Sequence, residues 1–344
     1  MSSPGIRCYS PSQSSRWCRR GREEAMIRVV MCAHNGAHFL EAQLASIMEQ
    51  QLPVDRVHVF DFASTDATRS LLAGLAPRWP RLDVRLVDHA PGVTLSFRHA
   101  LAEIVPRCAD DDLVFLSDQD DVWLPQKTAR MAARVAAARR GVDDRILAFH
   151  DVILCDAELR ELRPSFYEGR PFRLPRDLEP ARLMIASPVI GHTIAATPAL
   201  LALMLEHQRL EHYVMHDWAL VLLATYLGRV EFEPERLGLY RQHDSNVLGA
   251  GRRRSAIGYV RRAATLSRAV NVQARAFIAD LPVAAAVVNE RADRSPLPGR
   301  GPLAWRLGVA MATHGPTIWH RALGLTQLRY LVPFWRDAGA RDGS

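Results

Sequence analysis

Short apolar segments and amphipathic segments alternate from Met26 to about residue 150, and this alternation constrains the fold more than any other feature. The apolar segments have the length of buried strands, and the intervening segments carry apolar residues at helical spacing, as Phe39, Leu44 and Ile47 do. Strands and helices that alternate through short connections favour a parallel sheet covered by helices on both faces. The predicted strands are 27–32, 57–60, 82–87, 112–116 and 146–150, and the predicted helices are 38–50, 64–75, 94–106 and 125–140.

The pattern changes beyond residue 150, where we expect an extension packed on the first sheet. A loop rich in Pro and Arg is predicted for 160–180. Two helix ends carry recognisable signals, since Ser64 or Thr65 is the expected cap of the second helix and Pro125 suits the first turn of the fourth. The further predicted strands are 152–155, 188–196, 230–232 and 237–242, and the further predicted helices are 200–205 and 216–227.

An acidic cluster, Asp118-Gln119-Asp120-Asp121, directly follows the fourth predicted strand. A buried strand that ends in carboxylates places them at the carboxyl edge of the sheet, where open α/β sheets bind ligands. Carboxylates one residue apart suit a divalent cation held by oxygen ligands. A solvated acidic turn is the alternative for so short a motif. A calcium-binding EF-hand does not fit, because Trp123 stands where its sixth position requires Gly and Ala129 where its twelfth requires Glu.

Several functional classes lack their sequence signatures. No apolar run approaches the roughly 18 residues that a membrane-spanning helix needs. The absence of a G-x-G-x-x-G motif after the first strand and of a Walker A loop disfavours dehydrogenases and P-loop enzymes. Lys127 is the only lysine among the 44 Lys and Arg residues, a bias that we do not interpret as a nucleic-acid signal. Five scattered cysteines predict free thiols in a reducing compartment: Cys8, Cys18, Cys32, Cys108 and Cys155.

The two ends of the chain differ from its middle. Residues 1–25 are rich in Ser, Arg and Pro without periodicity, and we expect them to be disordered or to precede the true start of translation at Met26. The net charge of +7 is concentrated in the ends, because 251–344 is strongly basic and 26–250 is mildly acidic. We expect 251–344 to form a basic helical C-terminal extension. Its amphipathic stretches, 257–269 and 317–335, suit either an anionic membrane surface or packing on the domain that precedes them.

Five motifs in chain order resemble family 2 glycosyltransferases, the inverting enzymes of the GT-A fold, over about residues 26–250. Val-Val-Met-Cys-Ala-His-Asn-Gly (29–36) is similar to the family's opening strand with T-Y-N-G, and Val-Phe-Asp-Phe-Ala-Ser-Thr-Asp (59–66) to its V-x-D-D-G-S-T-D. Three more resemble a branch that includes bacterial rhamnosyltransferases: 117–125 its S-D-Q-D-D-x-W, 215–218 its H-D-W, and 239–247 its Y-R-Q-H-x-x-N-V. The implied fold is α/β, a Rossmann-like GT-A domain with a mostly parallel sheet flanked by helices.

The resemblance implies a role for each matching residue. Asp217 is the expected catalytic base, and His216 either tunes it or contacts the acceptor. The expected ligands of Mg²⁺ or Mn²⁺ at the DXD motif are Asp120, Asp118 and His243. The alternative role of Asp118 is a contact with the ribose of the nucleotide, and that of His243 is binding of the diphosphate. Asp121 is the next candidate for a metal ligand, or it holds the loop in place. Gln119 stands at the position of the motif that varies. The expected nucleotide-sugar-binding residues are Cys32, His34, Asn35, Asp61, Phe62, Asp118 and Arg241.

The resemblance implies a metal-dependent transferase that moves a sugar, with rhamnose as the candidate, from a dTDP- or UDP-linked donor to a surface-glycan or lipid-linked acceptor. It would act in cell-wall polysaccharide synthesis in the cytoplasm, with peripheral contact to the inner face of the cytoplasmic membrane as an open alternative. Phe62 and Ala63 depart from the family, which usually has Asp and Gly there. These departures leave room for a degenerate, non-catalytic scaffold subunit. A nucleotidyltransferase is a further alternative, although 33–37 lacks the Gly-rich basic loop that such enzymes carry.

Overall fold

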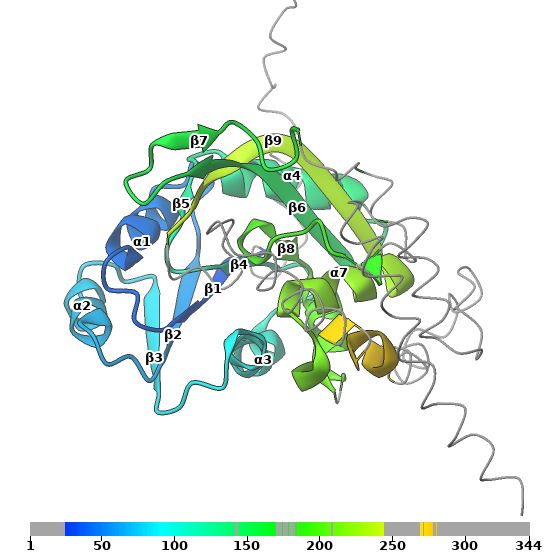
Figure 1. Cartoon of the computed structure of the whole chain (residues 1–344), viewed down its shortest axis with the longest axis horizontal. Coiled ribbons are helices and arrows are strands. Elements are labelled where there is room, and N and C mark those ends of the chain that lie inside the picture. The colour runs from blue at the N-terminus through cyan, green and yellow to red at the C-terminus, as the bar shows by residue number, and fades with distance from the viewer. Residues whose placement is uncertain are drawn as a thin grey trace, which may run out of the picture.

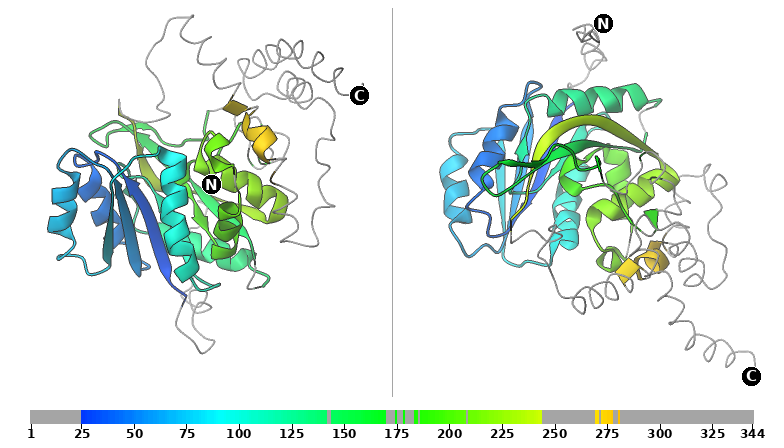
Figure 2. Two further views of the ribbon diagram at one scale, coloured as in Figure 1. Left: turned by 90° about the horizontal axis from the view of Figure 1, so that it is seen from below. Right: turned by 45° about the horizontal axis from the view of Figure 1, so that its top comes forward.

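One curved β-sheet with helices on both faces organises the protein (Figures 1 and 2). The computed structural model describes residues 25–141, 144–169, 174, 178, 183–184, 186–207, 209–243, 269–270, 272–277 and 280. The helices are α1 (Leu40–Met48), α2 (Thr68–Leu75), α3 (Val93–Ile104), α4 (Lys127–Ala138), α6 (Pro198–Leu205) and α7 (His216–Leu227). The strands are β1 (Ile27–Ala33), β2 (Arg56–Phe62), β3 (Leu82–Val87), β4 (Leu113–Ser117), β5 (Val122–Trp123), β6 (Ile146–Cys155), β7 (Glu161–Arg163), β8 (Ala195–Ala196) and β9 (Arg229–Arg241).

The sheet is parallel in its first half and mixed in its second. Among the described residues the strand order is β3-β2-β1-β4-β8-β6-β9-β5, with β7 paired to β6. The pairs among β1, β2, β3 and β4 are parallel, whereas β8 lies antiparallel between β4 and β6. The predicted α/β class with a mostly parallel sheet is therefore confirmed, and the carboxyl ends of β1, β2 and β4 meet at one edge.

Alternating side chains on the central strands build two separate cores. Val29 and Met31 face a core that includes the apolar residues of α1, α2 and α4, whereas Val30 faces one built with α3, α6 and α7. This division follows from the period of two along a strand, which sends successive side chains to opposite faces. The helices consequently lie in two layers, one on each side of the sheet (Figure 1).

Several element boundaries differ from the predicted ones. The strands predicted at 146–150 and 152–155 are one strand, β6, because its pairing with β9 shifts register at His150 and Asp151 and so carries the polar pair inside the strand. The predicted strands 230–232 and 237–242 likewise form the single strand β9. The predicted strand 188–196 is wrong for most of its length, since Gly191–Thr193 is a 3₁₀ turn and β8 is two residues long. The two short strands β5 and β7 were not predicted.

The predicted cap of the second helix is also wrong. Helix α2 begins at Thr68 without a side-chain cap. The Ser64 hydroxyl instead accepts the Asn35 N–H at 2.8 Å, which ties the loop after β2 to the loop after β1.

The ends of the chain contribute little to the described structure. Nearly all of 1–25 and most of 251–344 lie outside the described residues, so what the sequence predicts for those two segments stays a prediction. A short helical piece at 272–277 packs on the α6–α7 side, with Ala274 and Phe277 buried in its core. Within the described parts of the chain, no helix has the length and apolar character needed to cross a bilayer. Cys32, Cys108 and Cys155 are free thiols, as expected, and the other two cysteines lie outside the described residues.

We expect Gly228→Ala to destabilise the protein by about 2–3 kcal/mol. A Cβ at Gly228 would lie 2.2 Å from the backbone oxygen of Arg145, and backbone cannot move aside as a flexible side chain can. That same oxygen accepts the Arg229 N–H, so any displacement also disturbs the start of β9. Urea unfolding measures the loss. Gly74→Ala is the matched control, because a Cβ there meets nothing within 4 Å, and equal stability of the two variants would contradict the expectation.

Candidate active site at the carboxyl edge of the sheet

The acidic loop 118–121 lies between β4 and β5 and is fixed in place by Arg241 at the end of β9. The Arg241 backbone N–H donates to Asp121 Oδ1 at 3.0 Å, and its Nε donates to the Asp120 carbonyl oxygen at 2.7 Å. The guanidinium also lies over the Phe39 ring, with 4.4 Å between its central carbon and the ring centroid. Arg241 is 4% exposed, so the residue predicted to hold diphosphate acts here as a clamp on the acidic loop.

Three side chains of this region converge closely enough to hold a cation. Ligand atoms of Asp118, Asp121 and His192 all lie within 4.8 Å of one another. His192 Nδ1 is 2.8 Å from Asp121 Oδ2 and 3.6 Å from Asp118 Oδ2. Burial alone would lower the pKa of His192, but the charges of Asp121 and Asp118 outweigh it and raise that pKa to about 9.

Asp120 points to a different partner. Its Oδ2 lies 2.9 Å from His243 Nε2, so two of the three predicted metal ligands are in contact. Burial, followed by the nearby charges of Asp121 and Asp118, raises the pKa of Asp120 to about 8. A carboxyl that is hard to ionise beside two other carboxylates is an environment that a cation would relieve. The structure thus offers two adjoining ligand sets, Asp118 with Asp121 and His192, and Asp120 with His243.

Asp217 lies in the first turn of α7 and faces the same edge. The side chain is buried, and its Oδ1 accepts the Trp218 N–H at 2.6 Å. Burial raises the pKa of Asp217 to about 7, against the hydrogen bonds from the Trp218 and Gly191 peptide N–H groups. A carboxyl with such a pKa is matched to proton transfer near neutral pH.

His216, which precedes it, is enclosed. Its ring stacks on Phe97 with 3.8 Å between centroids, and neither ring nitrogen has a hydrogen-bond partner. Burial lowers the pKa of His216 to about 4, so the imidazole is neutral at physiological pH.

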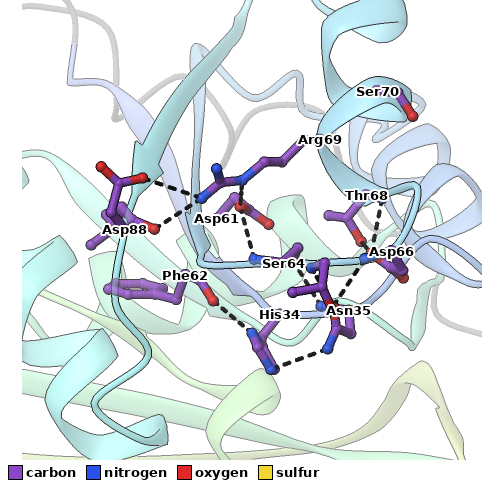
Figure 3. Close-up of polar contacts among 12 residues, drawn as sticks. His34, Asn35, Asp61, Phe62, Ser64, Asp66, Thr68, Arg69, Ser70 and Asp88 are labelled. Atoms are coloured by element: carbon purple, nitrogen blue, oxygen red, sulfur yellow. Dashed lines mark hydrogen bonds and ion pairs between the residues drawn. The ribbon is translucent and has the colours of Figure 1, made fainter.

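The loops after β1 and β2 are joined by a polar network around Asn35 (Figure 3). Asn35 Oδ1 accepts the backbone N–H groups of Thr65 and Asp66, and His34 Nδ1 contacts the Phe62 carbonyl oxygen at 2.6 Å. Asn35 has a φ of 51°, a left-handed conformation that Asn adopts more readily than most residues. His34 and Asn35, which were predicted to bind the nucleotide sugar, therefore lie along one side of the carboxyl edge of the sheet.

Gln119 locks the acidic loop to the loop after β1. Its Oε1 accepts the His34 N–H at 2.9 Å and its Nε2 donates to the His34 carbonyl at 3.0 Å. A Cβ at Gly36 would lie 2.2 Å from Gln119 Oε1, so the glycine leaves room for this contact. Gln119 was predicted to be the variable position of the motif, and the residues next to it in the sequence do not indicate its hydrogen bonds to His34.

A buried acid lies near the carboxyl end of β2. Asp61 is 0% exposed, its Oδ2 accepts Arg69 Nε at 2.7 Å, and its Oδ1 has no hydrogen-bond partner. Arg69 also approaches the exposed Asp88 at 3.7 Å, so one guanidinium bridges the ends of β2 and β3 (Figure 3). Cys32 is near Asp118, and burial followed by the Asp118 charge raises the pKa of its thiol.

Phe62 does not line this edge. Its side chain is 1% exposed and packs in the core, with 5.6 Å between its ring centroid and that of His99. Contact of the Phe62 side chain with a nucleotide sugar, as expected from the resemblance, would require that covering to move.

We expect Ala63→Gly to stabilise the protein by about 1 kcal/mol. Ala63 has a φ of 52°, a left-handed backbone conformation that costs an L-residue and costs glycine nothing. The greater freedom of glycine in the unfolded chain offsets part of the gain. Thermal unfolding of the variant is the measurement, and a lower melting temperature would contradict the prediction.

Two buried residues at the site were not predicted. His192 lies in the turn that the sequence pattern assigned to a strand, and Lys127, which is 0% exposed, donates from Nζ to the His192 carbonyl at 2.8 Å. The one available signal was compositional, since Lys127 is the only lysine of the chain.

Comparisons with known proteins find a family model and a relative that match part of this chain. Residues 28–180 match the family model described as Glycosyl transferase family 2. The match covers the carboxyl ends of β1, β2 and β4 and the acidic loop. An uncharacterized glycosyltransferase of Nostoc sp. is 21% identical over 225 residues, which are 64% of this chain. The aligned part spans 66% of that relative, just under two thirds of its length.

Solved structures of two other proteins have a similar outline. TarS of S. aureus with UDP is 14% identical, with a TM-score of 0.48, and the match covers 91% of this chain and 92% of that one. The mannosyltransferase PcManGT from Pyrobaculum calidifontis, with GDP-Man and Mn²⁺, is 20% identical, with a TM-score of 0.46 and coverages of 93% and 92%.

Proposed function

We propose that the chain is an inverting, metal-dependent glycosyltransferase that uses a nucleotide-diphosphate sugar and whose catalytic domain is 26–250. One observation carries this proposal: the buried carboxyl of Asp217 and the acidic loop 118–121 both lie against a single buried turn, Gly191–Thr193. A base and an anion-neutralising centre held this close suit attack of a hydroxyl on a sugar whose leaving group is a diphosphate.

Asp217 is the proposed base. Its carboxylate takes the proton of the acceptor hydroxyl as the hydroxyl oxygen bonds to the anomeric carbon. The bond from that carbon to the diphosphate oxygen breaks on the opposite face, and its electron pair leaves with the nucleotide diphosphate. The pKa of about 7 leaves part of the Asp217 population ionised at neutral pH, as this role requires.

The acidic loop fits Mn²⁺ or Mg²⁺. Carboxylates with one imidazole form a donor set known for first-row divalent metals, and oxygen ligands suit Mg²⁺. We propose Asp120 with His243 as ligands, with Asp118 contributing directly or through water. A cation bound there would neutralise charge on the leaving diphosphate. His34, Asn35 and Asp61 are the proposed contacts to the nucleotide.

The sugar and the acceptor are the finer part of the proposal. Similarity of 117–125, 215–218 and 239–247 to the rhamnosyltransferase-like branch favours rhamnose from a dTDP donor and a surface-glycan or lipid-linked acceptor. The basic segment 251–344, which lies mainly outside the described residues, is the proposed point of contact with a membrane surface.

The test is turnover of a panel of dTDP-, UDP- and GDP-sugars with Mn²⁺, with Mg²⁺ and with EDTA. We expect slow hydrolysis of one donor class with metal and none with EDTA. A degenerate scaffold is the second candidate, favoured by the buried Phe62 at a nucleotide-contacting position. No turnover of any donor, together with no thermal shift on adding nucleotide and metal, would select the scaffold.

A further inference from the structure

The buried turn Gly191–Thr193 contacts both halves of the proposed site. On one side the His192 imidazole approaches Asp121 and Asp118, at 2.8 and 3.6 Å. All three residues of the turn are buried. The turn is therefore packed directly against the acidic loop by an ion-pairing side chain.

The same turn also meets the start of α7. A Cβ at Gly191 would lie 3.6 Å from Asp217 Oδ2 and 3.0 Å from His216 Nε2. The Gly191 peptide N–H also hydrogen-bonds to the Asp217 carboxylate. The backbone of Gly191 thus touches the proposed base, with no side chain between them.

The turn rests on a buried lysine from α4. Lys127 Nζ donates to the His192 carbonyl oxygen at 2.8 Å and lies 3.7 Å from the centroid of the Trp123 ring. Burial lowers the pKa of Lys127 well below its usual range, although Asp121 and Asp118 oppose the shift. Burying an amine is strongly unfavourable without partners, so a fully enclosed lysine at this point indicates a specific requirement.

The identity of the residue supports such a requirement. In a chain whose other basic residues are all arginine, the one lysine occupies this position. The compact amine fits over one ring face and reaches one carbonyl, whereas a planar guanidinium has five N–H donors to satisfy.

We propose that the Gly191–His192 turn is a positioning bridge that fixes the acidic loop relative to Asp217, and that Lys127 is its anchor. This inference rests on the proposed function, because it assigns the bridge the task of aligning the base with the donor held at the loop. Lys127 and His192 are positioning residues, since they act through Asp118, Asp121 and Asp217. A displacement of about 1 Å between reacting groups can cost about 100-fold in rate.

The test is Lys127→Met, which keeps an unbranched side chain and removes the hydrogen-bond donor. We expect kcat to fall about 10- to 100-fold while KM for the nucleotide sugar stays within about threefold, because the contacts to the nucleotide sugar are intact and the alignment with Asp217 is lost. Amide hydrogen exchange should accelerate in peptides covering 188–197 and also in those covering 214–218. Arg134→Met is the matched control, because Arg134 lies on the same helix and pairs with Glu233 away from the turn.

Faster exchange in 188–197 without any change in 214–218, or an unchanged kcat, would overturn the bridge. If Lys127→Met does not fold, Lys127→Gln retains a hydrogen-bond donor and should keep more activity than Gly191→Ala, whose Cβ would lie 3.0 Å from His216 Nε2. Equal activity of those two variants would also overturn it. The exchange measurement needs no substrate, so it decides the bridge even if the wild-type protein turns over no donor and the proposed function fails.

Discussion

Asp217→Asn is expected to lower kcat for sugar transfer by about 10²- to 10⁴-fold while nucleotide binding changes by less than about threefold. An amide cannot take the acceptor's proton, yet its oxygen can still accept the Trp218 N–H that Asp217 Oδ1 accepts. Steady-state transfer and calorimetric nucleotide titration measure the two effects separately. Glu211→Gln is the control, because Glu211 is an exposed acid shortly before α7. Transfer that persists in Asp217→Asn would show that another group is the base.

The pH dependence of the wild-type enzyme follows from the same carboxyl. A base must be ionised, so with the pKa of Asp217 at about 7 the rate should rise with pH through 7 and level off above it. Loss of this acid limb in a slow Asp217→Asn variant would support the assignment. An acid limb near pH 4 would contradict it, because that is the ordinary range of an Asp carboxyl.

The free energy of unfolding should change with pH in the direction opposite to the rate. The pKa of Asp217 is raised from 3.8 to about 7, so between these values the unfolded state loses the proton before the folded state does. The contribution of Asp217 to the free energy of unfolding therefore falls as pH rises from about 4 to 7. Asp217→Asn removes this penalty and should be more stable than wild type by roughly 1–3 kcal/mol at pH 8, with a much smaller difference at pH 4. Urea unfolding at both pH values is the measurement.

Asp120→Ala is expected to weaken Mn²⁺-dependent donor binding by at least about 100-fold, since loss of even an outer residue around a metal typically costs 10- to 100-fold. Binding without metal should change little. Calorimetric titration of donor with Mn²⁺ and with EDTA gives both values. Asp110→Ala, at an exposed acid before β4, is the control.

The result also separates the two adjoining ligand sets. If metal-dependent binding survives Asp120→Ala but is lost in Asp121→Ala, the cation belongs with Asp118, Asp121 and His192. If it is lost in Asp120→Ala, Asp120 with His243 is the centre, as the sequence motif predicts. Retention of metal-dependent binding in both variants would show that neither of these two ligand sets is needed to hold the cation.

The central strands and helices could be predicted because their signals are local. The bounds of β3 and α7 are those predicted from the sequence pattern. The predictions that failed concern segments whose structure depends on contacts with backbone far away in the sequence. Strand β6 passes through its polar pair at 150–151 because β9 supplies a bulged register, and the segment 188–196 becomes a turn because it packs between the acidic loop and α7.

By itself the sequence determined the α/β class, the acidic loop at a strand end and the position of Asp217 at the start of a helix. These properties depend on residue type and spacing within one segment, which a linear pattern contains. Only the tertiary structure decided that Arg241 clamps the acidic loop, that Phe62 is buried, and that Lys127 and His192 lie under the site. Those contacts join residues many positions apart, and their burial and charge come from neighbours that only folding brings together.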